Sequence, residues 1–126
     1  FQGKVFHFLE YDKRFELARA QESPDFLREM VYGRLYWPVG LTAKAKAQYE
    51  QYLQEHMAQI ASAFIRQKRG KELEWLLHTY PLTPDQRELF AGLMDQANAS
   101  HASEILSMLM EYQRVHFPSR RRSFDL

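Results

Sequence analysis

The chain contains 126 residues, of which 45% are hydrophobic and 14% aromatic, and these values suit one folded domain with a buried core. Its formal net charge is +1 and its pI is about 8.2, whereas a nucleic-acid-binding domain usually has a pI above about 9. The chain has no cysteine, which excludes disulfide bonds, thiolate metal sites and cysteine nucleophiles.

No apolar stretch approaches the roughly 18 residues of a membrane-spanning helix, and no signal peptide is visible, so we expect a cytoplasmic protein. Residues 1–3 resemble the remnant of a cleaved expression tag. Residues 4–117 are predicted to form a single helical-repeat domain, and residues 118–126 a basic C-terminal tail. Because the chain lacks an initiator methionine, we also expect it to be part of a longer protein.

The first third of the chain predicts two helices. Residues 4–21 contain VFHFL, which would suit a short strand, but aromatic and small residues at helical spacing favour a helix. Those residues are Phe8, Tyr11, Phe15 and Ala18. Ser23 and Pro24 predict the start of a second helix, which ends near Tyr36, before Pro38. Its predicted buried residues are Phe26, Leu27, Met30, Val31 and Leu35.

The middle of the chain predicts one long helix. Thr42 is expected to cap a helix over residues 43–68, and Gly70 is expected to end it as a left-handed residue. Apolar and aromatic residues form a stripe with a period near 3.6, which predicts one buried face. The stripe consists of Ala45, Tyr49, Tyr52, Leu53, Met57, Ile60, Ala63 and Phe64.

The last third predicts three more helices. A short helix over residues 71–80 is closed by Pro81, and Thr83 and Gln86 form a capping box that opens the next helix. That fifth helix is predicted to bury Leu89, Phe90, Leu93, Met94 and Ala97, and to break at residues 98–100. The sixth helix, over residues 102–117, is predicted to bury Ile105, Leu106, Met108, Leu109, Tyr112 and Val115.

Two of these helices resemble each other in sequence. KELEWLLHTY at 71–80 and SEILSMLMEY at 103–112 match at an offset of 32 residues, which indicates stacked helix pairs. The matching pairs are Glu72 with Glu104, Leu73 with Ile105, Leu76 with Met108, Leu77 with Leu109, and Tyr80 with Tyr112. We therefore predict an all-α fold of about six helices in three antiparallel pairs, arranged as a short α-solenoid or a compact helical bundle.

The unit at residues 82–112 resembles a degenerate ankyrin repeat. The residues that carry the resemblance are Thr83-Pro84, the stripe Leu89, Leu93 and Ala97, and His101 to Ile105 followed by Leu106, Met108 and Leu109. The closing His-Phe, tri-Arg and Phe-Asp-Leu pattern is similar to ankyrin-like modules at the C-terminus of large Firmicutes proteins of unknown role. The resemblance implies an ankyrin-like solenoid that acts as a protein–protein interaction or scaffolding module, bound to another protein or to another domain of its parent.

No catalytic constellation is visible, so we expect no enzyme and assign no catalytic, cofactor-binding or metal-binding residue. The five histidines are not spaced as paired metal ligands, and the five glycines do not form a phosphate-binding loop. Carboxylates two residues apart, such as Glu72 and Glu74, point away from each other on a helix. Solvated helix faces explain such pairs.

The predicted partner-binding residues are Arg34, Tyr36, Trp37 and Trp75. Arginine and aromatic residues are favoured at binding hot spots, and the first three of these lie beside Pro38 at a predicted helix end. In the alternative interpretation, Trp37 fills the core between the first and second helix pairs. Trp75 lies off the predicted inner face of its helix, where it would cover a flank or offer a second contact.

The second functional hypothesis is anion or nucleic-acid binding. Its residues are Arg66, Lys68, Arg69 and Lys71, together with Arg120, Arg121 and Arg122 in the tail. The alternative is that the first cluster complements the dipole at the end of the long helix, and that the tri-Arg run is solvated. We expect nucleic acid to be an improbable partner, expect no membrane contact, and leave the oligomeric state open.

Overall fold

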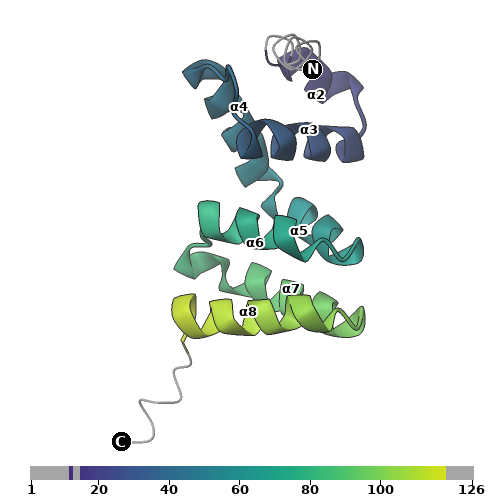
Figure 1. Ribbon diagram of the computed structural model, residues 1–126, viewed down its shortest axis with the longest axis vertical. Helices are drawn as coiled ribbons and strands as arrows, with labels where there is room; N and C mark the ends of the chain where they lie inside the picture. The colour runs from purple at the N-terminus through teal and green to yellow at the C-terminus, as the bar shows by residue number, and fades with distance from the viewer. Residues whose placement is uncertain (1–11, 13–14, 119–126) are drawn as a thin grey trace, which may run out of the picture. The chain divides into compact units, whose positions relative to one another are not determined.

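The computed structural model describes residue 12 and residues 15–118 (Figure 1). This part of the chain contains seven α-helices and one 3-10 turn, and no strand, which confirms the all-α prediction. The chain divides into two compact units, Phe1–Met57 (unit 1) and Ala58–Leu126 (unit 2). Most of the predicted helix over residues 4–21 lies outside the described residues.

Unit 1 contains three described helices, α2 (Phe15–Gln21), α3 (Pro24–Tyr36) and α4 (Ala43–Glu55). Both predicted N-caps are confirmed, because Ser23 Oγ accepts a hydrogen bond from the Phe26 N–H at 3.1 Å. Thr42 Oγ1 likewise accepts from the Ala45 N–H at 3.1 Å. Each cap satisfies one of the backbone donors that a helix leaves free in its first turn.

The core of unit 1 is aromatic. The ring of Phe15 lies 4.6 Å from the ring of Tyr49 and 5.8 Å from that of Tyr52, measured between centroids, and α3 packs against α4. All three rings are buried. The predicted burial of Phe26 is wrong, since its side chain is exposed. Phe26 precedes Leu27, the first buried residue of the α3 stripe, and one residue rotates it about 100° away from that face.

The predicted long helix over residues 43–68 is interrupted at His56, so this prediction is wrong. α4 ends at Glu55 and α5 (Met57–Arg66) begins two residues later. The backbone of His56 leaves the helical region with φ −120° and ψ 23°, and its ring Nδ1 lies 2.9 Å from the Tyr52 carbonyl oxygen. In a continuous helix, only a backbone N–H would bond to this carbonyl oxygen. Here the ring nitrogen of His56 lies against it as well.

Unit 2 contains most of α5, then α6 (Gly70–Thr79), the 3-10 turn η1 (Pro84–Gln86), α7 (Arg87–Ala99) and α8 (Ser103–His116). The predicted capping box is present at η1, where the Thr83 N–H donates to Gln86 Oε1 at 2.8 Å. α8 packs against both α6 and α7. The ribbons of these three helices lie side by side in Figure 1.

The turns that follow α5 and α7 have the same backbone geometry. Lys68 and His101 both adopt left-handed conformations, each with φ 56°. Each turn is closed by two hydrogen bonds as a Schellman motif. After α5 these bonds run from Lys68 N to Ile65 O (3.0 Å) and from Arg69 N to Phe64 O (2.8 Å). After α7 they run from His101 N to Asn98 O (3.1 Å) and from Ala102 N to Ala97 O (3.0 Å). The left-handed residue after the third predicted helix is therefore Lys68, and the prediction that Gly70 has this role is wrong.

Gly70 instead begins α6 at a close approach to α8. A Cβ atom at this position would lie 3.3 Å from Cγ1 of Ile105, which is tighter than an ordinary carbon–carbon contact. Packing between the two helices thus explains the glycine. The turn before it contains a lysine in the left-handed backbone conformation, despite the cost of that conformation for a residue with a side chain.

We predict that His101→Gly stabilises unit 2 by about 0.5–1 kcal/mol. A non-glycine residue with a left-handed backbone costs roughly 1–2 kcal/mol, and glycine removes this cost. Glycine also makes the unfolded chain more flexible, which offsets part of the gain in stability. Ser100→Gly is the matched control, because Ser100 has φ −87° and gains no relief. Urea denaturation measures both effects, and a lower stability of His101→Gly than of the parent chain would contradict the prediction.

The core of unit 2 is built around Tyr112. Its ring stacks on Phe90 with centroids 5.6 Å apart, and its hydroxyl accepts a hydrogen bond from the Leu82 N–H at 2.9 Å. Leucines from α6 and α8 complete the core: Leu73, Leu76, Leu77 and Leu109. The predicted burial of Val115 is wrong, since it is exposed on α8.

Three of the described helices end at an aromatic residue followed by proline. Trp37, Tyr80 and Phe117 are the C-caps of α3, α6 and α8, and each precedes a proline. Their φ values are −126°, −127° and −132°, and each backbone N–H still donates to the carbonyl four residues earlier. Proline disfavours the helical conformation of the residue before it, so the same dipeptide ends all three helices in the same way.

Candidate functional site

The three aromatic C-caps differ in exposure, although their backbones are alike. Phe117 is 2% exposed and Tyr80 is half-buried, whereas Trp37 is 57% exposed. Large aromatic side chains normally contribute their area to a core. Trp37 therefore differs in exposure from the other two aromatic C-caps.

Trp37 lies in an exposed group of large side chains in unit 1. Tyr36, Trp37 and Val39 are all exposed, Val39 by 44% of its surface. We call these three residues the Trp37 surface. Gly40, with φ 68°, supplies the left-handed position that turns the chain towards α4.

Arg34 holds the backbone of this surface from the inside. Its guanidinium donates to the carbonyl oxygens of Trp37 at 3.1 Å and Val39 at 2.9 Å. The same group pairs with both carboxylate oxygens of Asp12, at 3.0 and 2.8 Å. The guanidinium is rigid and planar and has several N–H donors. It can therefore bond a carboxylate and backbone carbonyls at the same time.

The prediction that Arg34 contacts a partner is wrong, because its side chain is 1% exposed in the structure. Its position on α3 aligns it with the buried stripe, so the guanidinium points inward. The residue supports the Trp37 surface and does not form part of it.

Tyr49 completes the network around Asp12. Its hydroxyl donates to the Asp12 carboxylate, and burial, followed by that hydrogen bond, raises the pKa of Tyr49 well above its usual range. The hydrogen bond to Asp12 likewise raises the pKa of Arg34. The network thus holds a buried cation, a buried carboxylate and a neutral phenol, with no side-chain polar atom left unsatisfied among the buried groups described.

Trp75 lies in unit 2 and is half-buried. Its ring meets the ring of Tyr80 edge-on, with centroids 5.9 Å apart. The structure therefore does not bring the two predicted tryptophan contacts together within one unit, and Trp37 is the more exposed of the pair.

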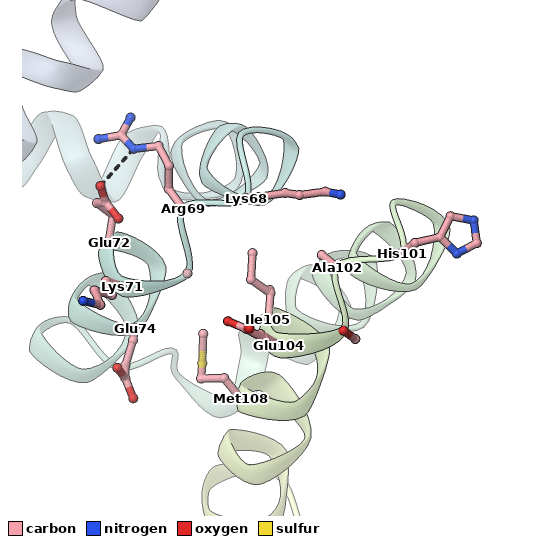
Figure 2. Close-up of a pocket in the computed structure, with 12 residues that line it drawn as sticks. Lys68, Arg69, Lys71, Glu72, Glu74, His101, Ala102, Glu104, Ile105 and Met108 are labelled. Atoms are coloured by element: carbon pink, nitrogen blue, oxygen red, sulfur yellow. Dashed lines mark hydrogen bonds and ion pairs between the residues drawn. The ribbon is translucent and has the colours of Figure 1, made fainter.

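A pocket of about 760 Å³ lies in unit 2, between the first turns of α6 and α8. Its apolar residues, Ile105 and Met108, extend from α8 towards α6, with the Glu104 carboxylate beside them (Figure 2). The ends of the Lys68 and His101 side chains point away from these residues in Figure 2. The centre of the pocket is therefore apolar and acidic on the α8 side.

The structure brings three residues of the predicted anion site to this pocket. Lys68, Arg69 and Lys71 line it, but so do Glu72, Glu74 and Glu104, and the opposite charges offset one another. Arg69 already pairs with Glu72 at 3.1 Å and donates to Gln67 Oε1 at 3.0 Å. Arg66, which does not line the pocket, donates to Ser62 Oγ at 3.3 Å. The remaining predicted residues, Arg120–Arg122, lie outside the described residues.

Sequence reasoning missed the residues that support the Trp37 surface. Asp12 and Tyr49 lie 22 and 15 residues from Arg34, and no local motif joins them. Tyr49 was visible only as a member of an apolar stripe, and Val39 only as a neighbour of Pro38. One feature of the sequence indicated that such partners exist. Arg34 falls at an inward position of a helix, where an unpaired charge would be costly.

Within residue 12 and residues 15–118, His, Asp and Glu side chains form no group of three or more that could hold a metal ion. No described helix is both long enough and apolar enough to cross a membrane.

The Trp37 surface is the best-defined candidate site in the described residues, because its exposed side chains lie on a turn whose backbone Arg34 holds from the inside. Comparison of the chain with protein-family models, with curated proteins and with solved structures yields no match.

Proposed function

We propose that this chain is a non-catalytic protein-interaction module that binds another protein, or another domain of its parent, through the Trp37 surface. The observation that carries the proposal is the exposure of Trp37 at a helix end whose two counterparts are buried or half-buried. Tryptophan and tyrosine are among the residues enriched at binding hot spots.

The support beneath the surface makes it suited to binding. Arg34 bonds the two carbonyls that flank Pro38, and Arg34 is itself held by Asp12. A backbone that is already ordered loses little conformational entropy when a partner docks, so more of the contact energy appears as affinity. An exposed aromatic side chain on a rigid turn therefore favours recognition.

We further propose an ankyrin-like stacking of antiparallel helix pairs as the scaffold. The two Schellman turns support this proposal, because their left-handed residues, Lys68 and His101, lie 33 residues apart. Helix pairs that repeat at such a period bury their apolar faces against neighbouring pairs. The aromatic–proline ends of α3, α6 and α8 add a second repeated feature.

We predict that Trp37→Ala weakens partner binding by about 30-fold or more, since a hot-spot residue contributes about 2 kcal/mol or more. Proteins captured from a lysate of the source organism by the parent chain and by Trp37→Ala would be compared by quantitative mass spectrometry. Candidates lost with the variant would then be purified and their Kd values measured by calorimetry.

Trp75→Phe is the matched control, because it changes the other tryptophan and leaves the Trp37 surface intact. Circular dichroism must show that both variants keep the helical content of the parent. Equal capture and equal Kd values for Trp37→Ala and the parent chain would refute the proposed site.

A further inference from the structure

The Trp37 surface combines exposed apolar groups with a local excess of positive charge, and we infer that its partner presents an acidic segment with an apolar anchor. This inference rests on the proposed function and adds the chemical class of the partner. It follows from the charges that lie around the surface along α3 and α4.

No carboxylate occurs in the sequence between Glu29 and Glu50, the stretch that contains the whole Trp37 surface. The cations in this stretch are Arg34, Lys44 and Lys46. The charge of Arg34 is used internally, because it is paired with Asp12. The two lysines are exposed, and they give this stretch of the chain a net positive charge.

The two lysines lie close to the surface along the chain. The turn that carries Val39 leads directly into the cap residue Thr42, and Lys44 follows two residues later. The Lys46 N–H donates to the Thr42 carbonyl oxygen at 2.9 Å, which places Lys46 in the first turn of α4. Lys44 is five positions after Val39 in the chain, so their Cα atoms are at most about 18 Å apart.

The first turn of α4 adds to the positive charge of the two lysines. It contains no acidic residue, and the N-terminus of a helix carries a partial positive charge. An aspartate or glutamate balances this end in other described helices, as Asp25 does in α3 and Glu72 in α6, whereas α4 and α5 have none. The start of α4, immediately after the Trp37 surface, lacks this balance.

These observations favour one class of partner. An acidic segment gains Coulomb energy and faster association from exposed lysines, whereas a basic segment is repelled. The apolar part of the surface, Trp37 and Val39, requires a leucine or an aromatic residue on the partner to exclude water. The pocket in unit 2 does not offer this combination, because its lysines and glutamates offset one another.

The test is selection from a random peptide library displayed on phage, with the full chain immobilised and Trp37→Ala used for counter-selection. We expect the recovered peptides to carry a net negative charge together with leucine, phenylalanine or tryptophan. Labelled synthetic copies of these peptides would then be titrated by fluorescence anisotropy at low and high salt.

The variant Lys44→Glu/Lys46→Glu should weaken binding of these peptides by about tenfold or more at low salt, and the difference should shrink at high salt because exposed charges are screened. Lys71→Glu is the matched control, since it reverses an exposed lysine in the first turn of α6, in unit 2. It should leave peptide binding unchanged.

Recovered peptides that are neutral or basic, or that bind the double lysine variant as well as the parent, would overturn the inference. If such peptides still require Trp37, the proposed function stands and only the partner class is wrong. Peptides whose recovery does not depend on Trp37, or a failure to enrich any peptide, would count against both.

Discussion

Asp12→Ala is expected to destabilise unit 1 by about 3–5 kcal/mol, because it leaves the Arg34 guanidinium buried without its counter-charge. Arg34 and Asp12 expose 1% and 6% of their side chains, so water cannot replace the lost carboxylate. The Tyr49 hydroxyl, which donates to the same carboxylate, loses its acceptor as well.

Urea denaturation and hydrogen exchange of the α3 and α4 amides measure this effect. Glu55→Gln is the control, since it breaks an Arg–Glu pair in the same unit, at 2.9 Å, that is exposed to solvent. Exposed pairs contribute at most about 1 kcal/mol.

The double variant Asp12→Ala/Arg34→Met should lose less stability than the two single changes added together, because no unpaired charge remains. A cost of Asp12→Ala no larger than that of Glu55→Gln would show that the network does not carry this energy.

Tyr112→Ala is expected to destabilise unit 2 by about 3–5 kcal/mol, the usual cost of deleting a large buried aromatic side chain. The ring of Tyr112 contacts Phe90 from α7 and stacks on His116 of its own helix at 4.0 Å. Its removal therefore opens a cavity where α7 packs against α8, and urea denaturation should show a lower midpoint for this unit.

Tyr112→Phe separates the hydrogen bond from the ring. It keeps the packing but leaves the buried Leu82 N–H without an acceptor, at a cost of about 1–3 kcal/mol. Tyr80→Phe is the comparison, because Tyr80 matches Tyr112 in sequence at the offset of 32 residues but is a half-buried C-cap. If Tyr112→Phe leaves the urea midpoint of unit 2 unchanged, the Leu82 bond contributes no measurable stability.

The helix boundaries were predictable because their causes are local. Ser23, Thr42 and the Thr83–Gln86 pair each act on backbone groups within three residues, so the sequence alone indicates where α3, α4 and η1 begin. The interruption at His56 was not predictable in this way. An apolar stripe continues through it without a proline or glycine, and only the backbone geometry reveals the break.

The left-handed turn residues illustrate a different limit. Glycine is the expected residue where φ is positive, so Gly70 was assigned this role, whereas the structure gives it to Lys68, two residues earlier. The same substitution of an ordinary residue for glycine occurs at His101. A rule based on residue preference fails where tertiary packing, here the approach of Gly70 to Ile105, determines the position of the glycine.

The candidate site was predictable only in part. Trp37 was a candidate contact beside Pro38, but it was left open whether its side chain is exposed or fills the core. Its neighbour Arg34 was assigned to the outside because arginine is favoured at binding hot spots. The partners that hold Arg34 inside, Asp12 and Tyr49, come from distant parts of the chain. Side-chain burial depends on such long-range contacts, which one sequence does not display.

The division of the chain after Met57 places one tryptophan in each unit, Trp37 in unit 1 and Trp75 in unit 2. The variants Trp75→Phe and Trp37→Phe would each retain a single emitter, so that fluorescence follows one unit at a time. Coincident urea transitions in the two variants would show that the units unfold as one cooperative system, and separate midpoints would give the stability of each. The two tryptophans can therefore be used to measure the free energy of coupling between unit 1 and unit 2.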